Sequence, residues 1–125
     1  MAKLKATPKN YTEANDVLQG RDSMRLGNNT HLVRMKDGSI CVRLHNTYIV
    51  EFWPSGRIYL FTGRYRTVTT KDRINQFISG RVYQKAHQWY FVTEGYNWES
   101  AGEPFIEGIE VSWHTPKTIA FRRAS

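Results

Sequence analysis

Three turn signals divide residues 30–61 into four short alternating segments, and this punctuation constrains the fold more than any other feature of the chain. The signals are Asp37-Gly38, His45-Asn46-Thr47 and Pro54-Ser55-Gly56. Residues of these types favour tight turns, and apolar residues that alternate with polar ones between turns are typical of half-buried strands. The sequence therefore predicts an antiparallel meander of four strands.

The length of each turn predicts which residues pair across this meander. A two-residue turn at Asp37-Gly38 and three-residue loops at the other two signals give one consistent register. That register pairs Met35 with Ile40, Val33 with Val42, Leu44 with Tyr48, Val50 with Leu60, and Phe52 with Ile58. Because side chains alternate along a strand, all of these pairs lie on one face, which we expect to be the core.

The opposite face of the predicted sheet mixes cations with large rings. It holds Arg34, Arg43 and Arg57 together with Trp53, Tyr59 and Phe61. The outer face of a half-solvated sheet usually carries simple polar residues, so rings at these positions require either a cover or a ligand.

Beyond the meander, the sequence predicts a helix and a second hairpin. Thr69 and Asp72 have the spacing of a capping box, and apolar residues at i, i+3 and i+4 predict a helix over residues 70–78 that Gly80 can end. Alternating residues predict a hairpin over 81–93, and a last short strand is expected near residues 109–113. The fold class is therefore α+β: a four-strand antiparallel meander, one capped helix, a second hairpin and a C-terminal loop and strand.

Length and charge predict one domain with a basic body. A chain of 125 residues can bury one core and is too short for two ordinary domains. The net charge of +7 is unevenly spread, because every charged residue between 93 and 116 is acidic. We expect a single domain, 1–125, with a basic N-terminal arm (1–10), a sheet and helix core (30–93), an acidic aromatic loop region (94–116) and a basic tail (117–125).

The single cysteine and the N-terminal composition predict a protein of a reducing compartment. Cys41 has no second cysteine to pair with, and no long apolar run follows the first residues. We therefore expect a location in a cytoplasm and no membrane partner. Four scattered histidines and one cysteine supply no close pair of metal ligands, and neither a metal nor a cofactor is expected.

Three segments of the chain resemble a group of small uncharacterised proteins encoded by tailed bacteriophages. They are LGNNT at residues 26–30, VRLHNT at residues 42–47 and RTVTTKDRIN at residues 66–75. The resemblance covers roughly residues 17–93. One departure lies before the predicted helix, where the group tends to have two glycines and an aromatic residue and this chain has Gly63-Arg64-Tyr65. The resemblance implies a phage protein that acts inside a bacterial host, and it implies no catalytic residue.

The segment from Arg57 to Lys85 carries the strongest candidate for a binding surface, because it has seven cations and a single acid. Threonines lead into a predicted helix N-terminus, whose free N–H groups attract anions, and nearby rings can stack on bases. The leading prediction is non-enzymatic binding of nucleic acid or another polyphosphate. The expected contacts are Arg43, Arg57, Arg64, Tyr65, Arg66, Thr69, Lys71 and Arg73. The same arginines could equally form a solvated face.

Three other functions remain open from the sequence. The acidic region could be an interface for a host or phage protein, built on Trp98, Phe105 and Trp113, in an inhibitor of a host enzyme or defence factor or in a component of a phage assembly. It could also be a lid whose rings cover the outer face of the sheet. A closed pocket lined by the same arginines would suit sequestration of a signalling nucleotide. A phosphoesterase would use His45 in the His-Asn-Thr segment, but the second copy that such a mechanism needs is not convincing at His114.

Overall fold

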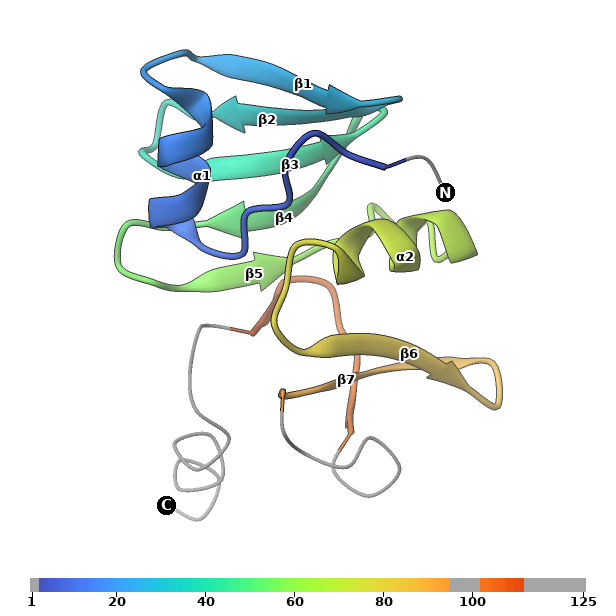
Figure 1. Cartoon of the computed structure of the whole chain (residues 1–125). Helices are drawn as coiled ribbons and strands as arrows, with labels where there is room; N and C mark the ends of the chain where they lie inside the picture. The colour runs from blue at the N-terminus through green and yellow to red at the C-terminus, as the bar shows by residue number, and fades with distance from the viewer. Residues whose placement is uncertain (1–2, 95–101, 112–125) are drawn as a thin grey trace.

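The computed structural model describes residues 3–94 and 102–111, which form two antiparallel sheets and two short helices (Figure 1). The elements are α1 (Tyr11–Leu18), β1 (Ser23–Gly27), β2 (Thr30–Arg34), β3 (Ile40–Leu44), β4 (Thr47–Phe52), β5 (Ile58–Leu60), α2 (Val68–Asn75), β6 (Arg81–Lys85), β7 (Gln88–Val92), β8 (Glu103–Pro104) and β9 (Ile109–Glu110). The larger sheet has six strands in the order β1-β2-β3-β4-β5-β9, and the smaller has the order β6-β7-β8. The fold is therefore α+β, as predicted.

The second half of the meander has the predicted register. Val50 pairs with Leu60 and Phe52 with Ile58 across β4 and β5. All four side chains are buried on the face that α1 crosses in Figure 1. The turn signal at residues 54–56 fixed this register because Gly56 adopts a φ of 96°, which favours glycine.

The predicted register of β2 is wrong by one residue. Arg34 pairs with Ile40 and Leu32 with Val42, so that Leu32 is fully buried while Val33 and Met35 are only half-buried. The connection is longer than the predicted two-residue turn and spans residues 35–39. Asp37 closes it, because its Oδ1 accepts hydrogen bonds from the backbone N–H and the hydroxyl of Ser39, at 2.9 and 2.7 Å.

The meander is also longer than predicted, because β1 precedes it and β9 follows at the other edge. The β3–β4 turn has two residues, His45 and Asn46, since Leu44 pairs with Thr47. A β-bulge beside Val42 then accommodates Ile49, which is fully buried. The predicted pair of Leu44 with Tyr48 is therefore wrong, and Tyr48 pairs with Arg43 on the outer face.

The N-terminal segment packs on the larger sheet. Leu4 and Pro8 are buried, and the backbone N–H of Lys5 donates to the carbonyl of Leu26 at 2.8 Å. The helix α1 begins after Asn10, whose side-chain oxygen accepts a hydrogen bond from the backbone N–H of Glu13. One hydrophobic cluster includes residues of α1, α2 and both sheets.

The helix α2 begins two residues earlier than predicted and ends earlier as well. Thr67 is the N-cap, with its hydroxyl accepting a hydrogen bond from the backbone N–H of Thr70 at 3.1 Å, so the predicted cap at Thr69 is wrong. A hydroxyl at position 67 has an N–H within reach three residues on, whereas Thr69 already lies inside the helix. Ile74 and Phe77 are fully buried, as the predicted apolar face requires.

The second hairpin is confirmed, and the acidic region adds a strand to each sheet. The strands β6 and β7 pair over the whole of Arg81–Lys85 and Gln88–Val92, and β8 pairs with β7. The predicted C-terminal strand is present as β9, which pairs with β5 at the edge of the larger sheet. Part of the predicted acidic loop region thus consists of strands.

Candidate functional site

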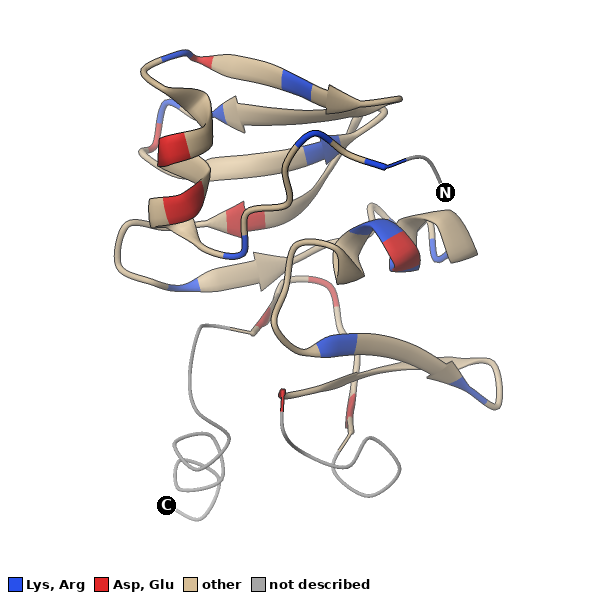
Figure 2. Ribbon diagram, viewed as in Figure 1, with Lys and Arg blue, Asp and Glu red and all other residues tan. Residues whose placement is uncertain are grey.

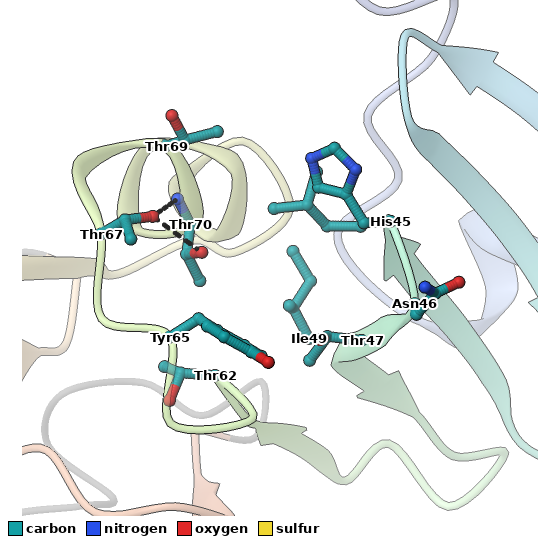
Figure 3. A pocket seen from close by; sticks show the side chains of 10 residues that line it. His45, Asn46, Thr47, Ile49, Thr62, Tyr65, Thr67, Thr69 and Thr70 are labelled. Atoms are coloured by element: carbon teal, nitrogen blue, oxygen red, sulfur yellow. Dashed lines mark hydrogen bonds between the residues drawn. The ribbon is translucent and has the colours of Figure 1, made fainter.

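Two connecting segments and the first turn of α2 line a pocket of about 470 Å³. The connecting segments are the β3–β4 turn and the loop that follows β5 (Figure 3). The lining residues are Leu44, His45, Asn46, Thr47, Ile49, Thr62, Tyr65, Thr67, Thr69 and Thr70. Five threonines, one histidine and one tyrosine give the pocket hydroxyl and imidazole groups, while Leu44 and Ile49 supply apolar wall.

His45 lies at the rim because two turns hold each other in place. The backbone N–H of His45 donates to the carbonyl of Asn29 at 2.8 Å, which joins the β3–β4 turn to the β1–β2 turn. Both residues have positive φ angles, 55° and 58°, which residues of tight turns can adopt. The imidazole is exposed and points toward the pocket, opposite Tyr65 (Figure 3).

Glu107 positions the loop that carries Tyr65. Its carboxylate accepts hydrogen bonds from the backbone N–H groups of Thr62 and Gly63, at 2.7 and 3.2 Å, and from the Thr62 hydroxyl. Thr62 in turn accepts hydrogen bonds from the backbone N–H of Arg64 at its hydroxyl and from that of Tyr65 at its carbonyl. The Tyr65 side chain is 65% exposed, so one wall of the pocket is an accessible ring.

A second pocket of about 380 Å³ adjoins the first, and the two share Leu44, His45 and Thr69. Its other lining residues are Asn28, Asn29, Asp72 and Arg73. All of its lining residues come from the segments 26–30, 42–47 and 66–75, which carry the resemblance to the phage proteins. Segments far apart in the sequence are thus brought together here.

Arg73 is the unusual side chain of this second pocket. It is only 4% exposed, and its Nε and Nη1 atoms have no hydrogen-bond partner within the described part of the chain. Burial lowers the pKa of Arg73 from its ordinary value, but a guanidinium keeps its proton at neutral pH. The site therefore contains a buried positive charge with unused donors, and the exposed carboxylate of Asp72 at the same pocket is the one opposing charge among its lining residues.

The structure brings together three of the residues predicted to bind phosphate and separates the others. Tyr65 and Thr69 line the first pocket, and Thr69 and Arg73 line the second. Lys71 lines a different pocket, between α2 and β6, with Arg81 and Tyr83. Arg64 is exposed on the loop before α2 and lines none of these pockets.

Arg66 already has partners in the fold. Its Nη2 lies 3.7 Å from a carboxylate oxygen of Glu107 and donates to the carbonyl of Phe105 at 3.5 Å. Its guanidinium carbon lies 5.1 Å from the ring centroid of Phe105 and 5.9 Å from that of Trp89. These contacts give Arg66 a role in holding the loop before α2 to the second sheet.

Arg43 and Arg57 lie apart from the pockets. Arg43 is on the outer face of the larger sheet, paired with His31 and Tyr48, and its buried Nε has no partner among the described residues. Arg57 precedes β5, whose other end approaches α2 (Figure 1). The adjacent Tyr59 hydroxyl and the charge of Glu110 raise the pKa of Arg57. Figure 2 shows the cations on β1, β2, β3, α2 and β6 and on several loops, not gathered into one stripe.

The predicted protein interface can be assessed at one residue. Phe105 is 3% exposed and packs edge-on against Trp89, with 5.7 Å between ring centroids, so its ring belongs to the core. Trp98 and Trp113 lie outside the described residues. The segment that follows Phe105 lies against the outer ring Phe61, because a Cβ on Gly108 would approach that ring within 3.3 Å. This contact covers one of the rings that the sequence left exposed.

Cys41 is buried beside Ser39, and burial raises the pKa of its thiol to about 12. Because the thiolate is the nucleophile, we expect the native protein to resist a thiol reagent such as DTNB near pH 8 and to react fully once unfolded in guanidinium chloride. The absorbance of the released thiol product measures this. Rapid stoichiometric reaction of the native protein would contradict the buried position.

Sequence reasoning missed the two asparagines of the β1–β2 turn and the threonine after the β3–β4 turn as site residues. The sequence analysis treats Asn28 and Asn29 as turn residues and Thr47 as part of a turn and of the His-Asn-Thr segment, although all three lie within the segments that carry the phage resemblance. Their position in these segments was the signal from which they could have been identified as site residues. No group of three His, Cys, Asp or Glu side chains that could hold a metal ion occurs within residues 3–94 and 102–111.

Fold and site together define a small α+β protein whose candidate site is built from connecting segments at one end of an antiparallel sheet. Residues 7–112 match the family model described as Kyanoviridae Gp96 protein. The chain belongs to this family, which confirms the resemblance to a tailed-phage protein family. The match extends from the segment before α1 to just beyond β9 and so includes every residue of the two pockets. No curated protein and no solved structure matches the chain.

Among the described residues, no helix is long and apolar enough to cross a membrane, since α1 and α2 have eight residues each.

Proposed function

We propose that this phage protein binds nucleic acid or another polyphosphate in the host cytoplasm, without catalysing a reaction, and that a phosphate of the ligand contacts Arg73. The observation that carries the proposal is the buried Arg73 guanidinium, which lines a pocket while its Nε and Nη1 lack partners. Buried polar groups are almost always hydrogen-bonded, so a charged group with two unused donors requires an explanation. An anionic ligand that accepts hydrogen bonds from these two donors supplies that explanation.

Phosphate suits this arginine better than other anions do. A guanidinium presents parallel N–H donors that match two phosphate oxygens. Because Nε and Nη1 are themselves buried, the proposal requires the guanidinium to turn toward the pocket that Arg73 lines. The amides of Asn28 and Asn29 and the hydroxyl of Thr69 at the same pocket offer neutral donors to the remaining oxygens.

Two further features support an anionic ligand. The first pocket lies at the first turn of α2, where the helix dipole favours negative charge. The net charge of +7 attracts polyanions at long range. Asp72 lines the second pocket, and we expect its carboxylate to reduce the affinity for an anion that Arg73 provides there.

The test measures binding of fluorescent single-stranded DNA and RNA by anisotropy at two salt concentrations. We expect Thr69→Glu, which places a carboxylate at the rim of both pockets, to weaken binding by at least about tenfold, because like charges repel in this partly buried site. Val68→Glu is the matched control. It makes the same charge change one residue earlier on α2, at a side chain that is 64% exposed and lines neither pocket.

Arg73→Met tests the guanidinium itself and is expected to abolish binding, with circular dichroism as the check on folding. Equal affinities of the Thr69→Glu and Val68→Glu variants would contradict the proposal, as would a folded Arg73→Met variant that binds like the wild type. A wild-type protein that binds neither nucleic acid nor inorganic polyphosphate at low salt would contradict it too. Mass spectrometry of the recovered oligonucleotide is expected to show it intact; cleavage that His45→Ala removes would instead indicate a phosphoesterase.

A further inference from the structure

We infer that the site accommodates one nucleotide unit, with its base in the threonine-lined pocket against Tyr65 and its phosphate at Arg73. This inference rests on the proposed function and specifies the ligand of the same site. The unit can belong to a free nucleotide or to the end of a strand, because both present the same base, sugar and phosphate.

The first pocket has the properties of a base site. Its volume of about 470 Å³ is within the range of small-molecule pockets, about 300–1,000 Å³. Leu44 and Ile49 give it an apolar wall, and Tyr65 adds an accessible ring to the lining (Figure 3). A planar base can stack on such a ring, and the surrounding hydroxyls can reach its polar edge.

The second pocket has the properties of a phosphate site, and it adjoins the first through lining residues that the two share. Thr69 and Arg73 are four residues apart, so they lie on the same face of α2, about 6 Å apart along the helix axis. Thr69 lines both pockets, as does His45 on the opposite side. A ligand with its base near Tyr65 would therefore pass between Thr69 and His45 before its phosphate reached Arg73.

The arrangement of cations favours a single unit over a continuous strand. A strand-binding groove has cations in a row that follows the backbone. Here Arg73 is the one cation among the residues that line the two pockets. Lys71 and Arg81 line a separate pocket between α2 and β6, and Arg66 is held by Glu107. One phosphate contact is thus all that these pockets provide.

The first experiment compares ligands that share parts of one nucleotide by isothermal titration calorimetry. We expect nucleoside 5′-monophosphates to bind, and ribose 5-phosphate and the nucleoside to bind at least about tenfold more weakly, because each lacks one of the two contacts. The affinity of an oligonucleotide should fall with salt at a slope of about −0.7, the value for one phosphate contact. A much steeper slope would indicate a strand along the surface and overturn the inference.

The second experiment separates this inference from the proposed function. Tyr65→Ala is expected to weaken nucleotide binding by at least about fivefold through lost stacking and to leave ribose 5-phosphate binding unchanged, whereas Tyr65→Phe keeps the ring and the affinity. Because Tyr65 is exposed, neither variant should affect folding. If Tyr65→Ala binds nucleotides normally while Thr69→Glu still loses nucleic acid, the one-nucleotide inference fails and the proposed function stands.

Linear and circular single-stranded DNA then distinguish the source of the nucleotide. Preference for a linear strand with a terminal phosphate over a circle indicates a strand end, and tighter binding of the mononucleotide than of either DNA indicates a free nucleotide. Both results support the single unit. A circle that binds as tightly as the linear strand, with neither DNA exceeded by the mononucleotide, overturns it.

Discussion

Replacement of Glu107 by alanine is expected to lower the free energy of unfolding by about 2–4 kcal/mol, because a buried polar group that loses its partner costs about 1–3 kcal/mol. The Glu107 carboxylate accepts hydrogen bonds from the backbone N–H and hydroxyl of Thr62 and from the N–H of Gly63, and it pairs with Arg66. Thr62 is fully buried, so alanine at position 107 leaves the backbone N–H and the hydroxyl of Thr62 without their protein partner.

The same substitution should weaken ligand binding, because Glu107 holds the loop that forms one wall of the pocket. Thr62 and Tyr65 both line that pocket, and the backbone N–H of Tyr65 donates to the carbonyl of Thr62. A loop released from Glu107 no longer fixes the ring of Tyr65. Binding by Glu107→Ala is therefore expected to fall toward that of Tyr65→Ala even at temperatures where the variant is folded.

Urea unfolding followed by circular dichroism measures the change in stability. Ile106→Ala is the matched control, because it truncates a neighbouring side chain that is 63% exposed and should change the midpoint little. Glu107→Gln keeps one acceptor oxygen and the shape of the side chain but loses the charge, so we expect an intermediate loss. A Glu107→Ala variant as stable as Ile106→Ala would refute the bracing role.

The sequence predicted strand pairing correctly where the residues of the connecting turn allow a single turn length. The turn at residues 54–56 gave the right pairing of β4 with β5, and the hairpin at 81–93 was also right. The β2 register failed because Asp37 closes a longer loop through hydrogen bonds to Ser39, and composition does not distinguish that loop from a two-residue turn. The strand β1 was missed because residues 23–27 show no clear alternation.

The sequence predicted some of the residues that line the candidate site, but not how they are placed. Arginine and threonine around residues 64–73 pointed to phosphate, and Tyr65, Thr69 and Arg73 do line the pockets. The sequence did not show that Arg73 is buried or that Arg66 is occupied by Glu107, because both depend on segments distant in the chain. The contribution of the β1–β2 turn depends likewise on one long-range hydrogen bond, from His45 to Asn29.

Asn75 is the second residue whose loss should have a large effect, because its side chain joins α2 to the smaller sheet as a neighbouring strand would. Its Oδ1 accepts a hydrogen bond from the backbone N–H of Val82 at 2.7 Å, and its Nδ2 donates to the carbonyl of Val82 at 2.8 Å. Val82 is fully buried in β6. We expect Asn75→Ala to lower the free energy of unfolding by about 2–4 kcal/mol, since both backbone groups then lack a partner.

Two variants and one local measurement make this prediction specific. Asn75→Asp keeps the acceptor for the Val82 N–H but directs a second acceptor at the Val82 carbonyl, so we expect it to be no more stable than Asn75→Ala. Gln84→Ala, at an exposed residue of the same hairpin, should change stability by less than about 0.5 kcal/mol. Amide hydrogen exchange at Val82 should accelerate in Asn75→Ala beyond what the change in global stability requires. Unchanged protection of the Val82 amide would show that β6 is held to α2 by apolar packing alone. Loss of that protection in a variant that still binds nucleotide would show that Asn75 secures the second sheet independently of the pocket.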